Sequence, residues 1–193
     1  MNTDLILFLM AAMFSPGPNI IMLTTSGARF GVNATVPHLF GVVIGVGIIG
    51  AVSGLGIGAL IAAQPSLQWV LQCASAVWIL WMAYRLLTSD DTAEGGNTTR
   101  PMRFWEAVIF QWVNPKIWAI ALAASSGYTA GLRPFSEALQ MGLSFSGVNF
   151  FVCVFWTFFG ALLTFLLNSP KSWQVFRITM AALLAMSAGL VFW

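Results

Sequence analysis

Charged residues are scarce in this sequence, and no Asp or Glu lies near the middle of a long apolar run. Only 7% of the 193 residues are charged, against roughly a quarter in an average soluble domain. Hydrophobic residues make up 59%. A soluble fold of this size cannot hide so much apolar surface, because much of any small globule stays exposed to water. The composition therefore predicts an integral membrane protein.

Other residues that carry chemistry are also few. Cys73 and Cys153 stand alone in apolar runs, so the sequence predicts no disulfide framework, no cysteine metal site and no cofactor. A net charge of +2 without a basic stripe argues against a nucleic-acid partner. The N-terminus has no basic region, and its apolar run exceeds signal-peptide length, so we interpret it as the first span.

Six apolar segments are long enough to cross a bilayer, which takes about 20 helical residues. They cover residues 4–25, 39–63, 69–87, 104–126, 139–167 and 173–193. A polar stretch at 88–103 separates the first three from the last three. We therefore expect an all-α integral membrane protein with one domain, 1–193, in which repeats 1–87 and 104–193 are joined by a cytoplasmic linker, 88–103.

An internal repeat is indicated by glycines that recur at an offset of 100 residues. The pairs are Gly27 and Gly127, Gly31 and Gly131, and Gly47 and Gly147. Prolines also interrupt the first and fourth spans near the same offset. Because each half has three spans, the two copies would be inverted in the membrane, a 3+3 design found in transporters.

Basic residues predict the orientation, because cytoplasmic loops are rich in Lys and Arg. One face would hold Arg29, Arg85, Arg100, Arg103, Lys171 and Arg177, and the other only Arg133. We expect the first face to be cytoplasmic and both termini to be periplasmic. The pattern defines no oligomeric state, so a homo-oligomer stays open.

Two spans carry helix-breaking sequences. The first reads Ser15-Pro16-Gly17-Pro18-Asn19 near its middle, and two prolines around a glycine should break a helix. The fourth reads QWVNPKIWAI, where Asn114 suits an N-cap and Pro115 a first helical position. Each break would free backbone groups and create a helix N-terminus with partial positive charge. The alternative interpretation is a pair of packing kinks.

Lys116 is the one formally charged residue near the centre of a predicted span. An intramembrane charge normally faces water or a partner, so Lys116 suits the anionic group of a substrate. It could instead snorkel or bond carbonyls freed by a broken helix. Gln111 and Asn149 could line the same cavity or join helices. The predicted substrate-binding residues are Pro16, Gly17, Pro18, Asn19, Gln111, Asn114, Pro115, Lys116 and Asn149.

A cationic substrate side chain would find no anionic partner among the spans, so the sequence favours a neutral substrate. Carboxylate proton relays are missing for the same reason. If protons drive transport, His38 at the cytoplasmic end of the second span is a candidate for coupling; it could equally be an interfacial polar residue.

These motifs resemble a known family. SPGPN in the first span, the glycine-rich second span, the polar linker and FW…QWVNPK are similar to amino-acid exporters of the lysine exporter / homoserine-threonine resistance family, in particular its cysteine and O-acetylserine exporter branch. The resemblance covers the chain in length and span order. It implies proton-driven export of small neutral amino acids or derivatives, such as cysteine, O-acetylserine, threonine or homoserine, across the bacterial inner membrane. It supplies no set of site residues.

Three other functions compete with an exporter of amino acids. Distant relatives of that family include metal-ion exporters, but one histidine, two scattered cysteines and no mid-span acid make a poor ligand set. A non-transporting membrane subunit would tolerate replacement of both breaks. An intramembrane serine protease would need Ser144 within reach of His38, and the two are predicted near opposite faces. We therefore predict a transporter rather than an enzyme.

Overall fold

The computed structural model describes residues 3–15, 17–56, 64–88, 100–128, 132–167 and 169–189. These residues form helices joined by turns and short coil, without a strand in the part described. The helices are α1 (Thr3–Phe14), α2 (Pro18–Gly54), α4 (Pro65–Leu87), α5 (Phe104–Val113), α6 (Pro115–Gly127), α7 (Pro134–Leu163) and α8 (Pro170–Gly189). The predicted all-α architecture is confirmed.

Proline begins most of these helices. It is the first residue of α2, α4, α6, α7 and α8. A proline at this position loses nothing by lacking an N–H, and its fixed φ already suits the helix. The predicted spans began three to five residues too late at α4, α7 and α8, because the prolines were not used as start signals.

Helix α2 is a hairpin with two arms that meet at Gly31. Gly31 has φ 76° and ψ 172°, a left-handed conformation that favours glycine. The hydroxyl oxygens of Ser26 and Thr35 lie 2.9 Å apart, whereas nine residues of straight helix would separate them by roughly 13 Å. Thr35 Oγ1 donates to the Gly31 carbonyl, so Ser26 is the donor in this pair. Residues 26–38, which lie between the first two predicted spans, are thus helical except for Gly31.

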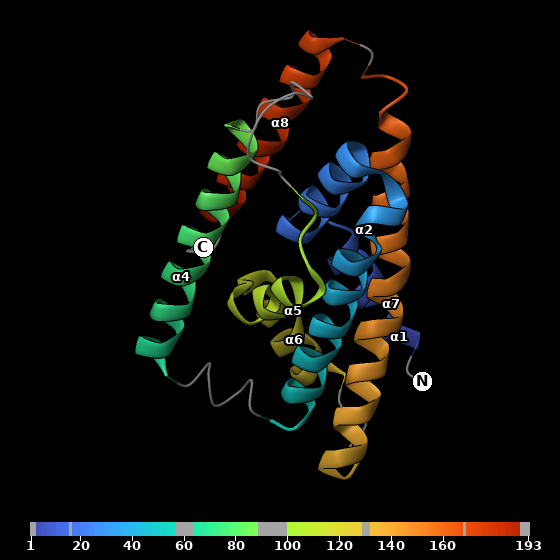
Figure 1. The fold of residues 1–193 in the computed structure, drawn as a ribbon. Coiled ribbons are helices and arrows are strands. Elements are labelled where there is room, and N and C mark those ends of the chain that lie inside the picture. Colours follow the sequence, from blue (N-terminus) through green and yellow to red (C-terminus); the bar gives the residue numbers. More distant parts are fainter. Residues whose placement is uncertain are drawn as a thin grey trace.

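Helices α2 and α7 make the principal packing contact of the described structure (Figure 1). A Cβ on Gly27 would lie 2.2 Å from the Thr157 carbonyl oxygen, and one on Gly160 would lie 2.1 Å from that of Thr24. The two backbones therefore touch at a reciprocal crossing that only glycine permits. In the second arm of α2, a Cβ on Gly50 would lie 2.6 Å from Phe145 Cγ of α7, so this glycine also permits close packing of the two helices.

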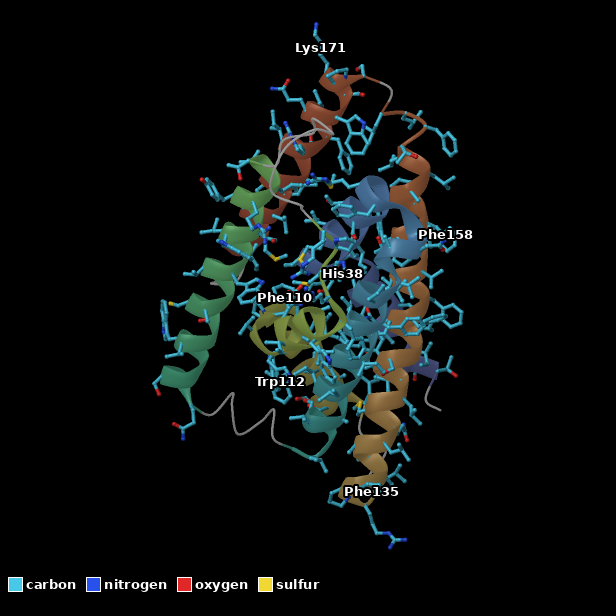
Figure 2. The ribbon with its side chains drawn as sticks, in the orientation of Figure 1. His38, Phe110, Trp112, Phe135, Phe158 and Lys171 are labelled. Atoms are coloured by element: carbon cyan, nitrogen blue, oxygen red, sulfur yellow. The ribbon has the colours of Figure 1, made fainter. Side chains whose placement is uncertain are left out.

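Four of the other helices, α4, α5, α6 and α8, lie on one side of this pair (Figure 1). Figure 1 shows α4 and α8 side by side along one flank, with the short helices α5 and α6 between that flank and α2. Large apolar side chains cover the outside: Phe135, at the end of the molecule opposite Lys171, is 77% exposed, and Phe158 of α7 is 52% exposed (Figure 2). Such a surface suits lipid.

The number of membrane spans is confirmed only in part. Among the described residues, α2 and α7 are each long and apolar enough to cross a bilayer, and the bent pair α5 and α6 qualifies when taken together. The six-span 3+3 repeat is therefore not established by helix length and hydropathy. Most of the predicted linker, 89–99, lies outside the described residues, as do 57–63 and 190–193 of the second and sixth predicted spans.

Candidate functional site

The first helix break lies between Phe14, the last residue of α1, and Pro18, the first of α2. Gly17 is fully extended, with φ −179° and ψ 177°, and its carbonyl accepts the first hydrogen bond of α2 from Ile21 N at 3.0 Å. Pro16 lies outside the described residues. The predicted break is confirmed.

The second break is a single residue, Asn114, between α5 and α6. Asn114 has an extended backbone (φ −83°, ψ 102°), and the two helices are bent by 64°. Pro115 is the first residue of α6, as predicted. Asn114 occupies the N-cap position, as predicted, although its side chain makes no capping hydrogen bond. Its Nδ2 instead lies 3.5 Å from Gln111 Oε1.

Both breaks open onto one small cavity of about 20 Å³. Among the predicted residues, those lining it are Gly17, Asn19, Asn114, Lys116 and Asn149. The N-termini of α2 and α6 therefore meet there, joined by α7, although the breaks are about a hundred residues apart in sequence. Pro18, Pro115 and Gln111 do not line the cavity.

Lys116 connects the two breaks. Its Nζ donates to the carbonyl oxygen of Ser15, which the end of α1 leaves without a helical partner. This is the alternative that the sequence left open, a bond to a carbonyl freed by the break. The Lys116 stem also lies close to Gly17, where a Cβ would be 2.9 Å from Lys116 Cδ. Gly17 thus gives the lysine room to cross from one break to the other.

Gln111 lies behind the cavity and fixes Asn19. Asn19 Nδ2 donates to Gln111 Oε1 at 2.8 Å, and Gln111 Nε2 donates back to Asn19 Oδ1 at 3.2 Å. Gln111 is fully buried, and its Nε2 also donates to the Ala107 carbonyl at 2.9 Å. Of its two predicted roles, Gln111 therefore has the second: it joins two helices and does not line the cavity itself.

Two buried amide atoms at the cavity have no hydrogen-bond partner among the described residues, Asn114 Oδ1 and Asn149 Nδ2. A volume of about 20 Å³ holds roughly one water molecule, which could serve both atoms. The cavity is too small for an amino acid, so this conformation is closed around the site.

The apolar lining of the cavity was not predicted. It consists of Met13, Ile20, Leu23, Ile117, Val152 and Cys153. Helical spacing would have found part of it, because Leu23 is four residues from Asn19, and Val152 and Cys153 are three and four from Asn149. Apolar residues are so frequent in this chain that spacing alone does not select them.

His38 lies apart from this cavity. It is 2% exposed, and neither ring nitrogen has a hydrogen-bond partner in the described structure. It borders a second cavity instead, together with residues of α2, α4 and α8. The hydroxyl of Ser144 in α7 likewise has no hydrogen-bond partner in the described structure. Ser144 neighbours Phe145, which packs on Gly50, and Gly50 is roughly 18 Å along the helix from His38, so no catalytic serine–histidine pair is formed.

Within the described ranges, no three His, Cys, Asp or Glu side chains come close enough to hold a metal ion. The structure therefore offers no observation in favour of the metal-ion alternative.

Apolar helices that break around a polar cavity are typical of secondary membrane transporters. Residues 10–192 match the family described as LysE type translocator, and the chain belongs to this family. The predicted family is confirmed, and its description as a translocator agrees with the prediction of a transporter rather than an enzyme.

Relatives point to the predicted branch. The chain is 30% identical over 126 residues to a cysteine/O-acetylserine efflux protein of Escherichia coli O157:H7, a match that covers 65% of this chain and 63% of that relative. The protein of the same name from Escherichia coli strain K12 is 29% identical over 126 residues, with the same coverage. No solved structure matches the chain.

Proposed function

We propose that this protein is a secondary exporter of small neutral amino acids or their derivatives, driven by protons across the bacterial inner membrane. Cysteine, O-acetylserine, threonine and homoserine are the candidate substrates. Family membership and the efflux relatives support an exporter of amino acids. The observation that carries the site is the meeting of two helix breaks and Lys116 at one cavity.

In this proposal the substrate carboxylate binds between the N-termini of α2 and α6. Those termini offer unpaired N–H groups and partial positive charge, and Lys116 adds a full charge. To bind the carboxylate, the Lys116 ammonium gives up its hydrogen bond to the Ser15 carbonyl. Substrate binding therefore breaks a contact at the first break. Asn19, held by Gln111, and Asn149 complete the polar lining.

The closed cavity supports alternating access, because a substrate can enter only after the helices around it move. We propose six spans in a 3+3 inverted repeat. α1 with the first arm of α2 would correspond to α5 with α6, the second arm of α2 to α7, and α4 to α8. The termini would be periplasmic and the face with Arg29, Arg85 and Lys171 cytoplasmic. His38 remains the candidate for proton coupling.

Feeding dipeptides to bacteria that express the protein, and measuring the free amino acids outside, tests this function. Wild type should export a few neutral amino acids in excess of vector controls. Lys116→Ala should lower efflux by at least about tenfold, since charge-assisted hydrogen bonds contribute about 1.5–3 kcal/mol. Asn19→Ala should lower efflux several-fold.

The matched control is Lys171→Ala, which removes a lysine that does not line the cavity and lies at the end of the molecule opposite Phe135 (Figure 2); it should export normally. Membrane levels are compared by immunoblot. Efflux that survives both site variants would contradict the broken-helix site but leave the exporter. No excess of any amino acid from wild type would contradict the exporter itself.

A further inference from the structure

One wall of the cavity at the breaks is formed by an unbroken helix. Helices α2 and α6 begin at the cavity, whereas α7 (Pro134–Leu163) runs past it without an interruption (Figure 1). This helix contributes Asn149, Val152 and Cys153 to the lining, and each of them is at most 4% exposed. An unbroken, packed helix holds its side chains in fixed relative positions, so this wall is suited to recognising the shape of a ligand.

The lining changes from polar to apolar along both α2 and α7. Asn19 of α2 is followed four residues later by Leu23, and Asn149 of α7 by Cys153, a step of one turn or about 6 Å. One turn further along α2, a Cβ on Gly27 would lie 2.2 Å from a backbone carbonyl oxygen of α7. The apolar end therefore lies next to a crossing that opens only if α2 and α7 separate, so a ligand side chain that points there has to be short.

The two amide atoms without a hydrogen-bond partner in the described structure are of opposite kinds, since Asn114 Oδ1 accepts and Asn149 Nδ2 donates. An α-ammonium only donates and therefore suits Asn114 Oδ1, while the helix N-termini suit the α-carboxylate. Asn149 Nδ2 is left for a further group that accepts. The amide interacts with the Cys153 thiol, but sulfur is a weak acceptor and leaves Nδ2 without a hydrogen bond of normal geometry.

We propose that this face of α7 recognises the side chain of the transported amino acid. Asn149 Nδ2 donates to an oxygen or sulfur on the β- or γ-carbon of the substrate, and Val152 and Cys153 limit the length of its side chain. The inference rests on the proposed export function, and the substrate class that it names includes cysteine, O-acetylserine, threonine and homoserine. An aliphatic amino acid of the same size is rejected because it leaves the buried amide donor unpaired.

The test measures exchange by the full chain, purified and reconstituted into liposomes, with a radiolabelled amino acid outside and the same unlabelled amino acid inside. Two pairs are compared: L-cysteine, kept reduced, with L-2-aminobutyrate, and L-homoserine with L-norvaline. In each pair a methyl group replaces the thiol or the hydroxyl, and the size hardly changes. The ratio of the two KM values does not depend on how much of the chain is folded, so a variant of low stability can still be measured.

Wild type should have a KM about tenfold lower for the thiol or hydroxyl member of each pair than for its methyl analogue. Asn149→Leu keeps the approximate size of the side chain but cannot donate, so it should bring this ratio close to one. Ser144→Ala is the matched control, because it also removes a buried polar group of α7 that has no hydrogen-bond partner in the described structure. Ser144 does not line the cavity, so the wild-type ratio should be kept.

Val152→Ala tests the limit on size, since it should let L-leucine, which wild type excludes, compete for exchange. Strong competition by L-leucine in wild type would overturn the assignment to α7, as would a KM ratio near one in wild type. A ratio that Asn149→Leu leaves unchanged would overturn it too, and an equal rise in both KM values would place the amide at the carboxylate instead. Absence of exchange of both L-cysteine and L-homoserine by wild type would overturn the export function itself.

Discussion

The first break lies between Phe14, where α1 ends, and Pro18, where α2 begins, whereas at the second break the chain leaves the helix at Asn114 alone and bends by 64°. The first break contributes backbone groups. The Ser15 carbonyl accepts a hydrogen bond from Lys116 Nζ, and Gly17, which has no side chain, lies beside the aliphatic part of the lysine. The second contributes the side chains of Lys116 and Asn114. The two breaks thus provide complementary parts, an acceptor in one and a cation in the other.

The glycines that repeat at an offset of 100 residues show the same asymmetry. Gly27 and Gly47 are pressed against α7, where a Cβ would lie 2.2 Å from Thr157 O and 1.8 Å from Ser146 Oγ, respectively. Gly127 and Gly147 have no atom within 4 Å of such a Cβ, and Gly131 lies outside the described residues. Glycines that recur in the sequence therefore do not all have the same packing role. In the first half these glycines permit close approach of helices, and in the second half Gly127 and Gly147 do not.

The largest difference in stability is expected between alanine variants of the two glycines of one pair, Gly27 and Gly127. Gly27→Ala forces a methyl group into the Thr157 backbone, which cannot move without shifting α7. Overpacking of this kind typically costs about 1–3 kcal/mol and sometimes more, so the midpoint of thermal unfolding in detergent should fall sharply. Gly127→Ala should leave it unchanged or slightly higher. Equal midpoints for the two variants would contradict the asymmetry.

A smaller effect should show that the two breaks are coupled by the amide pair of Asn19 and Gln111. Asn19→Ala or Gln111→Ala alone leaves the partner amide with fewer hydrogen bonds and should lower the unfolding free energy by about 1–3 kcal/mol. The double variant should lose less than the sum, with a coupling energy of about 1–2 kcal/mol in denaturation experiments in micelles. Additive losses would show that the breaks are energetically independent.

The smallest effect should come from Gly17→Ala. Its extended backbone suits any residue, so the fold should survive, but the new methyl group would lie 2.9 Å from Lys116 Cδ and push the lysine aside. We expect a loss of about 1 kcal/mol in substrate binding, which is roughly a fivefold rise in KM for efflux. Gly147→Ala is the control and should transport normally, because a methyl group there meets open space. A normal KM for Gly17→Ala would show that Lys116 does not need its observed position.

The sequence predicted the breaks because proline acts locally: its missing N–H and its ring interrupt a helix whatever surrounds it. It also predicted that Lys116, Asn19 and Asn149 lie together, since buried polar groups in an apolar chain seek one another. The hairpin at Gly31 was not predicted, because a glycine permits a positive φ without requiring it. The depth of His38 and the small volume of the cavity depend on how α2 packs on α5 and α7, which no local pattern specifies.

The hydrogen bond from Lys116 to the Ser15 carbonyl has an evolutionary consequence. A backbone carbonyl is present whatever side chain position 15 carries, so sequence drift there would leave the lysine's resting partner intact. Position 116 has no such freedom, because only its side chain provides the cation. Among relatives, we therefore expect position 15 to vary in residue type while position 116 keeps a positive charge.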